Sequence, residues 1–170
     1  MQLRGYLASH FFDIFGLEGT KQLAKTIREK CPWLDLYVPH ENDEINDKEV
    51  NDSDINAELI YEQDLERLLR SQVLIAYIDG VEIDAGVSSE LGIMAGHLET
   101  LELLSQEFGF SYSPKLIIGI YSDMRRKGTG DNHMYKNMFV LGLIMKHGVL
   151  VDTIDDVINS LQLFNEHYPV

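Results

Sequence analysis

The chain has 170 residues, of which 45% are hydrophobic, and its 14 basic and 28 acidic side chains give a formal net charge of −14. A chain of this length can bury a full core, and we expect residues 1–170 to form a single domain. The acidic balance argues against binding to a nucleic-acid polymer or an anionic membrane, because both require Lys and Arg to neutralise phosphate groups. A small neutral substrate remains compatible with this charge.

The single cysteine and the start of the chain bear on the compartment. Cys31 has no partner for an internal disulfide, and its place before Pro32 indicates a helix-end residue rather than a nucleophile. The first residues lack the apolar run of a signal peptide, and no segment has the length of a transmembrane helix. We therefore expect a soluble cytoplasmic protein.

In chain order, the sequence first predicts a strand at residues 3–8, a helix at 17–30 and a strand at 34–38. The stretch 41–54 is acidic and rich in Asn, and it contains few apolar residues. It predicts a solvated surface loop.

The rest of the chain continues the alternation of helix and strand. The further predicted elements are a helix at 55–70, a buried strand at 73–78, a helix from Ser88 or Ser89 to Gln106, a strand at 115–121, a helix at 135–146, a strand at 149–151 and a helix at 153–165. Parallel strands need crossover connections, and right-handed crossovers place helices on both faces of a sheet. We therefore predict an α/β fold with a doubly wound five-stranded parallel sheet.

Two features bear on cofactors. The Gly-rich loop 122–132 follows the fourth predicted strand but has neither spacing of the phosphate-binding loops, GxxxxGK[ST] or GxGxxG. The histidines at positions 10, 40, 97, 133 and 147 are scattered without a metal-ligand spacing such as HExxH. We expect neither a metal nor an organic cofactor.

Two carboxylates follow the third predicted strand, where the chain turns toward a helix. Asp84 lies in the connecting segment, and a helix capped by Ser88 or Ser89 would place Glu90 in or next to its first turn. The positive end of the helix dipole favours an ionised carboxylate there. In an open parallel sheet, this edge is the usual ligand site. Glu90 is therefore a candidate anionic nucleophile, and Asp84 a nearby acid or hydrogen-bond acceptor.

Spacing alone does not establish that chemistry, since acidic residues are common in first helical turns for capping and dipole compensation. A wider set of motifs is more specific. Four segments, in this order, resemble the nucleoside 2-deoxyribosyltransferases: Tyr6-Leu7-Ala8-Ser9-His10-Phe11-Phe12, Asp64 within Tyr61-Glu62-Gln63-Asp64-Leu65, Asp84-x-Gly86-x-x-x-Glu90-Leu91-Gly92, and Lys136-Asn137-Met138.

The resemblance implies a flavodoxin-like fold and an enzyme that moves 2-deoxyribose between nucleobases through a covalent glycosyl intermediate. Glu90 matches the family's nucleophile, and Tyr6 matches the tyrosine that orients it. Asp64 and Asp84 match acidic residues that bind and protonate the base or hold the hydrogen-bond network. This agrees with the chemistry, because an oxocarbenium-like centre needs a neighbouring carboxylate and the leaving base needs an acid.

The resemblance also implies substrate-binding roles for Phe11, Phe12, Gly86, Asn137 and Met138. In the family, the asparagine that Asn137 matches comes from a neighbouring subunit and binds the 5′-hydroxyl of the sugar. The resemblance therefore implies that the active site is complete only in a homo-oligomer. The implied partners are 2′-deoxyribonucleosides and free nucleobases.

Some positions depart from the family pattern. The family's frequent Thr after the motif glycine is Val87 here, and base-reading residues are expected near Asn42 and Asp43, in a loop without a clear alignment. The sequence therefore leaves the purine or pyrimidine preference open.

One alternative is a hydrolase on the same scaffold, an N-glycosidase for nucleosides or deoxynucleoside 5′-monophosphates. Arg125 and Arg126 are candidate phosphate donors for such an enzyme, although Asp123 and Asp131 are close enough in sequence to pair with them. A more distant alternative is a receiver-like signalling domain phosphorylated on Asp79. That function needs an acidic pair after the first strand to hold magnesium, whereas the chain has Ser-His-Phe-Phe there.

Overall fold

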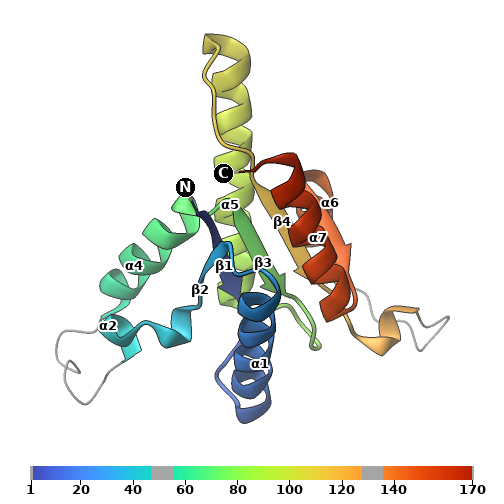
Figure 1. Cartoon of the computed structure of the whole chain (residues 1–170). Helices are drawn as coiled ribbons and strands as arrows, with labels where there is room; N and C mark the ends of the chain where they lie inside the picture. The colour runs from blue at the N-terminus through green and yellow to red at the C-terminus, as the bar shows by residue number, and fades with distance from the viewer. Residues whose placement is uncertain (1, 47–55, 128–135, 170) are drawn as a thin grey trace.

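The computed structural model describes residues 2–46, 56–127 and 136–169 (Figure 1). Its centre is one sheet of five parallel strands in the order β2-β1-β3-β4-β5. The strands are β1 (Leu3–Ala8), β2 (Leu34–Tyr37), β3 (Val73–Tyr77), β4 (Leu116–Ile120) and β5 (Gly148–Val151). The predicted α/β fold with a five-stranded parallel sheet is confirmed.

Helices cover both faces of this sheet. In Figure 1, α1 (Ile14–Lys30) and α7 (Ile154–His167) lie in front of the strands. The other face carries α4 (Ala57–Arg70), α5 (Ala85–Phe108) and α6 (Met138–His147). Shorter elements are η1 (Pro39–Glu41), α2 (Asp43–Asn46) and η2 (Met124–Lys127).

Alternation along the strands divides the core into two layers. Leu7 and Ile75 pack with the side chains of α1 and α7. Tyr6 and Leu74, one position earlier on the same strands, pack with those of α4, α5 and α6. Successive side chains on a strand point to opposite faces, so both layers need apolar residues, and β3, β4 and β5 are accordingly runs without a polar residue.

The strand order creates a switch point beside β1. The chain passes from β1 outward to β2, then returns past β1 to β3 on its other side. The helices that follow these strands therefore leave toward opposite faces, and a crevice opens at the carboxyl ends of β1 and β3. Ser9 follows the end of β1 and Asp79 follows the end of β3, so both lie at this crevice.

The structure differs from the prediction in the acidic segment 41–54. Its first part is not a plain loop, because Asp43–Asn46 forms the short helix α2 and Ile45 is buried. Asn46 fixes this turn by donating from Nδ2 to the carbonyls of Pro39 and Asn42. The predicted start of a helix at residue 135, and with it His133 and Asp131, lies outside the described residues.

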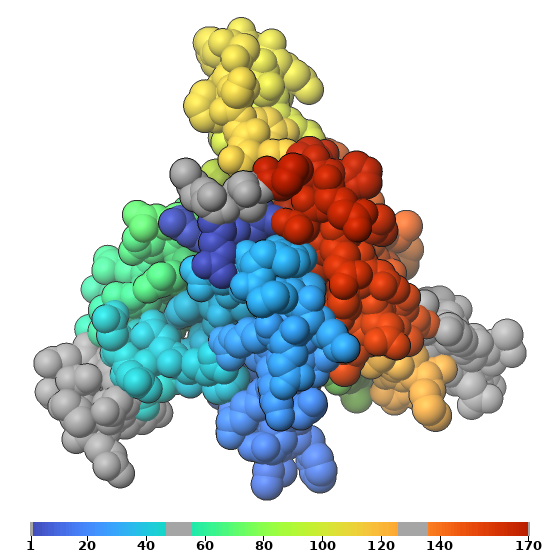
Figure 2. Space-filling model, viewed as in Figure 1, coloured from blue at the N-terminus to red at the C-terminus, as the bar shows by residue number. Residues whose placement is uncertain are grey.

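Two smaller features complete the fold. Cys31 is the buried C-cap of α1, as its predicted helix-end position requires. The end of α5 projects from the body of the molecule, as the yellow lobe in Figure 2 shows, and it exposes Leu103 and Phe108. None of the described helices is long and apolar enough to cross a membrane.

Candidate active site

A short hydrogen bond joins the first strand to the longest helix. Tyr6 is fully buried in β1 and points toward the face covered by α4 and α5. Its hydroxyl donates to Oε1 of Glu90 at 2.5 Å. Because Tyr6 is held by the strand ladder, this bond fixes the position of the Glu90 carboxylate and leaves Oε2 for other contacts.

The helix that carries Glu90 begins earlier than the sequence indicates. Asp84 is its N-cap, with Oδ1 accepting from the backbone N–H of Val87 at 3.1 Å. The prediction of a cap at Ser88 or Ser89 is therefore wrong, and both serines lie inside α5. Glu90 belongs to the second turn, where the favourable effect of the helix dipole has largely faded.

Burial, rather than the helix dipole, controls the charge of Glu90. Removal from water raises the pKa of its carboxyl group to about 7, and the charges of Asp64 and Asp84 act in the same direction. The hydrogen bond from Tyr6 opposes this shift because it stabilises the carboxylate. The expectation that the surroundings favour the ionised form of Glu90 is thus wrong, because burial favours the protonated form.

A second tyrosine supports the neighbouring carboxylate. Tyr37, at the end of β2, donates its hydroxyl to Oδ1 of Asp64 on α4 at 2.8 Å. The Tyr37 oxygen in turn accepts from Nδ2 of Asn42 at 3.1 Å. Burial raises the pKa of Asp64, and the bond from Tyr37 partly counteracts that rise. Asp64 therefore combines a fixed position with an increased tendency to hold a proton.

The two tyrosines connect these pairs into one network. Their rings lie with centroids 5.4 Å apart at an interplanar angle of 42°, and the guanidinium of Arg67 sits 5.5 Å from the centre of the Tyr37 ring. Aromatic pairs in such tilted contacts are mutually stabilising, and a guanidinium over the ring adds a cation–π contact. The structure thus brings together Tyr6, Asp64, Asp84 and Glu90 of the predicted site.

Sequence reasoning did not find Tyr37 and Arg67. A usable signal was present, since Tyr37 and Asp35 alternate with the buried Leu34 and Leu36 along β2. An aromatic residue on the same side as Tyr6 becomes meaningful only once β1 and β2 are known to be neighbours in register, with Tyr6 opposite Tyr37.

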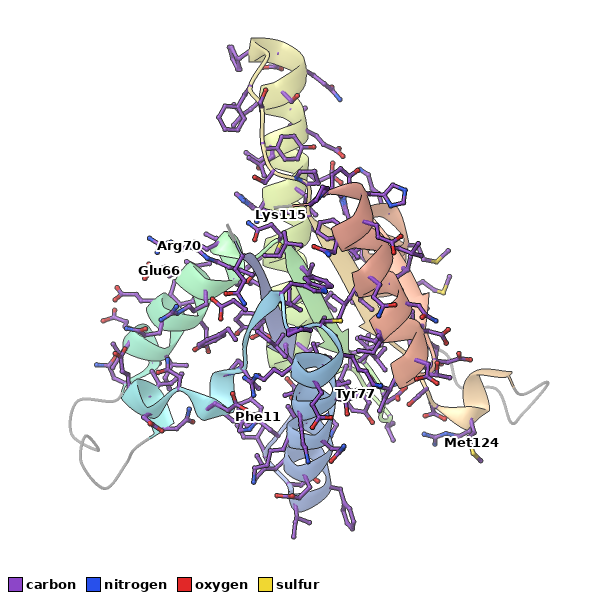
Figure 3. The ribbon with its side chains drawn as sticks, viewed as in Figure 1. Phe11, Glu66, Arg70, Tyr77, Lys115 and Met124 are labelled. Atoms are coloured by element: carbon purple, nitrogen blue, oxygen red, sulfur yellow. The ribbon has the colours of Figure 1, made fainter. Side chains whose placement is uncertain are left out.

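The predicted substrate-binding residues Phe11 and Phe12 follow β1. Their ring centroids lie 4.9 Å apart, and Phe11 also contacts the ring of His40 at 5.5 Å (Phe11 is labelled in Figure 3). Phe12 is largely exposed. Gly86 lies in the first turn of α5, where an added Cβ would come within 3.0 Å of Oδ1 of Asp84. A larger residue at 86 would crowd the capping carboxylate.

Asn137 and Met138 occupy the start of α6. Asn137 caps this helix, with Oδ1 accepting from the backbone N–H groups of Phe139 and Val140 at 3.0 and 3.3 Å. Within the described residues, no hydrogen bond joins Asn137 to Tyr6, Asp64, Asp84 or Glu90. Both Asn137 and Met138 are exposed, which leaves them accessible to a second subunit.

Asp79, the residue of the receiver-like alternative, ties two strand ends together. Its carboxylate accepts from the backbone N–H of Ser122 at 3.0 Å and of Asp123 at 2.9 Å, and also from the Ser122 hydroxyl. Nearby, the buried ammonium of Lys136 donates to the carbonyl of Gly80. Both oxygens of Asp79 are engaged in holding β3 to β4, and the described residues contain no cluster of His, Cys, Asp or Glu able to hold a metal ion.

The candidate phosphate donor Arg125 is paired inside its own loop. Its Nε and Nη2 atoms donate to the two carboxylate oxygens of Asp123 at 2.9 and 2.6 Å. An arginine engaged in this way is poorly available to a substrate phosphate. The structure therefore adds no support to the 5′-monophosphate alternative.

Known proteins resemble this chain in sequence profile and in fold. The sequence profile of a family described as nucleoside 2-deoxyribosyltransferase matches residues 6–159. A solved structure of a conserved protein from Enterococcus faecalis V583 is similar over 96% of this chain and 99% of its own, with 26% identity and a TM-score of 0.78. No sequence among the curated proteins is significantly similar.

Two further solved structures share the fold at low identity. A 2-deoxyribosyltransferase from Bacillus psychrosaccharolyticus is 16% identical, with 92% of this chain and 90% of that chain covered and a TM-score of 0.55. A 2-desoxiribosyltransferase from Leishmania mexicana is 14% identical, with 98% and 99% covered and a TM-score of 0.56.

Proposed function

Because the chain belongs to the nucleoside 2-deoxyribosyltransferase family, we propose that it transfers 2-deoxyribose from one nucleobase to another through a covalent intermediate on Glu90. The observation that carries this proposal is the carboxylate of Glu90 held at 2.5 Å by the Tyr6 hydroxyl, beside the carboxyl groups of Asp64 and Asp84. A fixed carboxylate with a second carboxyl group nearby is the arrangement that a retaining double displacement at the anomeric carbon uses, one group as nucleophile and the other as acid.

In the first step, Oε2 of Glu90 attacks C1′ of the nucleoside while Tyr6 holds Oε1. The C1′–N bond breaks, its electron pair goes to the base, and a nearby acid delivers a proton to that base. The products are a deoxyribosyl ester of Glu90 and a free nucleobase. In the second step, the nitrogen of an incoming base attacks C1′ and gives its proton to the acid that protonated the first base. The ester bond breaks, and its electron pair returns to the Glu90 carboxylate with overall retention.

The protonation states suit these roles. With a pKa of about 7, Glu90 is substantially ionised near neutral pH, and it is a more basic nucleophile than an ordinary glutamate. The raised pKa of Asp64 supports this residue as the acid that protonates the leaving base. Asp84 holds the start of α5 and is the second candidate, since it also carries a carboxyl close enough to influence Glu90.

The proposed substrates are 2′-deoxyribonucleosides and free nucleobases, with Phe11, Phe12, Gly86 and Met138 contributing to their binding. We further propose that Asn137 reaches the 5′-hydroxyl from a neighbouring subunit. An apolar hollow of about 540 Å³, lined by Gly92, Gly96, Gly142, Met138 and Phe139, lies along α5 and α6, which supports a self-association surface beside Asn137. The single domain over residues 1–170 and the cytoplasmic location remain predictions.

The direct test is chromatographic. The protein is incubated with 2′-deoxyinosine or with thymidine, with and without adenine, and every nucleoside and base is measured. Formation of 2′-deoxyadenosine only when adenine is present would support transfer. Release of a base without a new nucleoside would favour the hydrolase instead, and inactivity with both donors would contradict the proposal for nucleosides.

A further inference from the structure

A cavity opens at the carboxyl ends of the strands, on the face of the sheet opposite to Tyr6 and Glu90. It has a volume of about 300 Å³, and its walls include Leu23 and Ile120, which belong to the core layer under α1 and α7. Tyr6, by contrast, belongs to the layer under α4 and α5. The size lies at the lower end of the range of small-molecule sites, about 300–1,000 Å³.

One wall of this cavity is aromatic. The rings of His10 and Tyr77 lie with centroids 5.3 Å apart at an interplanar angle of 31°, and Figure 3 places Tyr77 between the lower ends of α1 and α7. The Tyr77 hydroxyl makes no hydrogen bond within the part of the chain that the structure describes. A planar ligand can stack on this wall and bond to that hydroxyl.

Gly16 and Gly19 of α1 also line the cavity. Gly16 lies so close to the His10 carbonyl that an added Cβ would be only 2.6 Å from it, whereas a Cβ at Gly19 would meet nothing within 4 Å. Ser9 and Thr20 also line the cavity, and their hydroxyl groups already form a hydrogen bond to each other at 2.7 Å. Ligand selection therefore depends on the aromatic wall and the rim.

The rim is acidic. Asp13 and Asp152 line it, and the charges of Asp13, Asp79 and Asp123 act on Tyr77, whose pKa is raised by burial first and by these charges in addition. Oδ1 of Asp13 caps α1 by accepting from two backbone N–H groups, while Oδ2 takes no part in the cap and lies 3.7 Å from the His10 ring. Carboxylates attract donors and cations and repel anions.

These observations exclude several occupants. The helix N-termini at the cavity are closed by their own caps, Asp13 and Thr153, and the surrounding acids disfavour a phosphate or carboxylate. The described carboxylates form no metal-binding cluster. What remains is a planar molecule that offers hydrogen-bond donors to carboxylates and a face to aromatic rings.

We propose that this cavity is a second ligand site, separate from that of Glu90, for a small planar heteroaromatic molecule that is neutral or cationic and bears an amino group. The amino group donates to the Asp13 carboxylate, and the ring stacks on the wall formed by His10 and Tyr77. The inference does not depend on the proposed transferase activity, because it concerns binding on the other face of the sheet.

Isothermal titration calorimetry with adenine as the probe tests the site. Gly19→Leu adds a bulky side chain at a position that lines the cavity and has free space around an added Cβ. Lys25→Leu is the matched control, since it introduces the same side chain at an exposed position of the same helix that does not line the cavity. We expect adenine binding at this site to weaken at least about tenfold in Gly19→Leu and to stay unchanged in Lys25→Leu.

Two further arms test this site without relying on Gly19→Leu. Tyr77→Phe removes only a hydroxyl and should weaken adenine binding by about two- to tenfold, which keeps the test valid if Gly19→Leu does not fold. Hypoxanthine, which lacks the amino group, should bind at least about tenfold more weakly than adenine. Equal adenine affinity in wild type, Gly19→Leu and Tyr77→Phe would overturn the proposal whether or not the protein transfers deoxyribose.

Discussion

The Tyr6 hydroxyl lies 2.5 Å from Oε1 of Glu90, and this bond opposes the effect of burial on the same carboxylate. Burial raises the pKa of Glu90, whereas the donated hydrogen bond lowers it. The tyrosine therefore has two effects, because it fixes one oxygen and keeps a buried acid ionisable near neutral pH.

Replacing Tyr6 should shift the pH dependence of the reaction. Tyr6→Phe removes the hydrogen bond that stabilises the carboxylate, so the pKa of Glu90 should rise above its present value of about 7. The nucleophile must be ionised, and the acidic limb of the profile of kcat/KM against pH should move to higher pH. At pH 7 we expect a loss of about tenfold or more.

Tyr61→Phe is the control for this experiment, since Tyr61 is an exposed tyrosine on α4. Its profile should match that of the wild type. An acidic limb that stays in place or moves to lower pH in Tyr6→Phe would show that Tyr6 does not act on the ionisation of Glu90.

The raised pKa of Glu90 also predicts a pH-dependent cost in stability. Between pH 4.5 and about 7 the folded protein holds a proton on Glu90 that the unfolded chain releases, so the contribution of this residue to stability falls as the pH rises through that window. Glu90→Gln keeps an acceptor for Tyr6 but cannot ionise. The difference in the free energy of unfolding between Glu90→Gln and the wild type should therefore shift in favour of the variant by about 1–3 kcal/mol from pH 4 to pH 8.

Urea unfolding at both pH values measures this difference. At pH 4 the two proteins should be nearly equal, because Glu90 is protonated in both the folded and the unfolded state. A variant that is less stable than wild type at pH 8 would contradict the assignment of a burial penalty to Glu90. The same variant should have no transferase activity.

Tyr37 is expected to be a positioning residue for Asp64. Tyr37→Phe removes the 2.8 Å hydrogen bond to Asp64 and leaves Asn42 without its acceptor. We expect kcat to fall by about three- to tenfold with little change in KM, and the free energy of unfolding to fall by about 1 kcal/mol.

A double-mutant cycle on kcat distinguishes positioning from general damage to the fold. If Tyr37 acts through Asp64, the double variant Tyr37→Phe with Asp64→Asn should be no slower than Asp64→Asn alone. Additive losses would contradict the positioning role. Tyr168→Phe, near the carboxyl end of the chain, provides a partly exposed tyrosine as the control.

Asp79 is expected to have a structural role. Asp79→Ala leaves the backbone N–H groups of Ser122 and Asp123 without their acceptor. We expect the free energy of unfolding, measured by urea titration, to fall by about 2–4 kcal/mol.

The same structural role predicts that magnesium with a small phosphodonor does not label the wild-type protein. Labelling at Asp79 would instead support a receiver-like domain.

The shared active site can be tested by mixing inactive proteins. Asn137→Ser removes the amide but keeps a helix-capping hydroxyl, so it isolates substrate binding from the stability of α6. Asn137→Ser and Glu90→Ala should each be nearly inactive. After subunit exchange, the mixture should recover part of the activity, because some sites then combine an intact Glu90 with an intact Asn137. No recovery despite measured exchange would rule out the shared site.

The fold was predictable because β3 and β4 are continuous apolar runs and the long helices have a recognisable apolar stripe or cap. The start of α5 was not predictable, since Asp84, Ser88 and Ser89 are all residue types that cap helices. The folded structure uses Asp84. The short helix α2 was also missed, because one buried residue, Ile45, is too weak a signal against an acidic background.

The candidate site was predictable as a set of residues but not in its electrostatics. A sequence shows that Glu90 lies near a helix start, where the dipole favours a negative charge. Its pKa depends instead on how deeply Tyr6 and its neighbours bury it, which is a property of the tertiary structure. Tyr37 was missed for a similar reason, because its partner Asp64 is far away in sequence and meets it only in the folded sheet.

The pairing of Tyr6 with Tyr37 in the ladder between β1 and β2 limits how this chain can change in length. One residue inserted into or deleted from β2 would turn the Tyr37 side chain to the face of α1 and α7, away from Asp64. The projecting end of α5 beyond the body has no such constraint. Insertions and deletions compatible with an active protein should therefore gather at that projection, and β1 and β2 should keep a constant length.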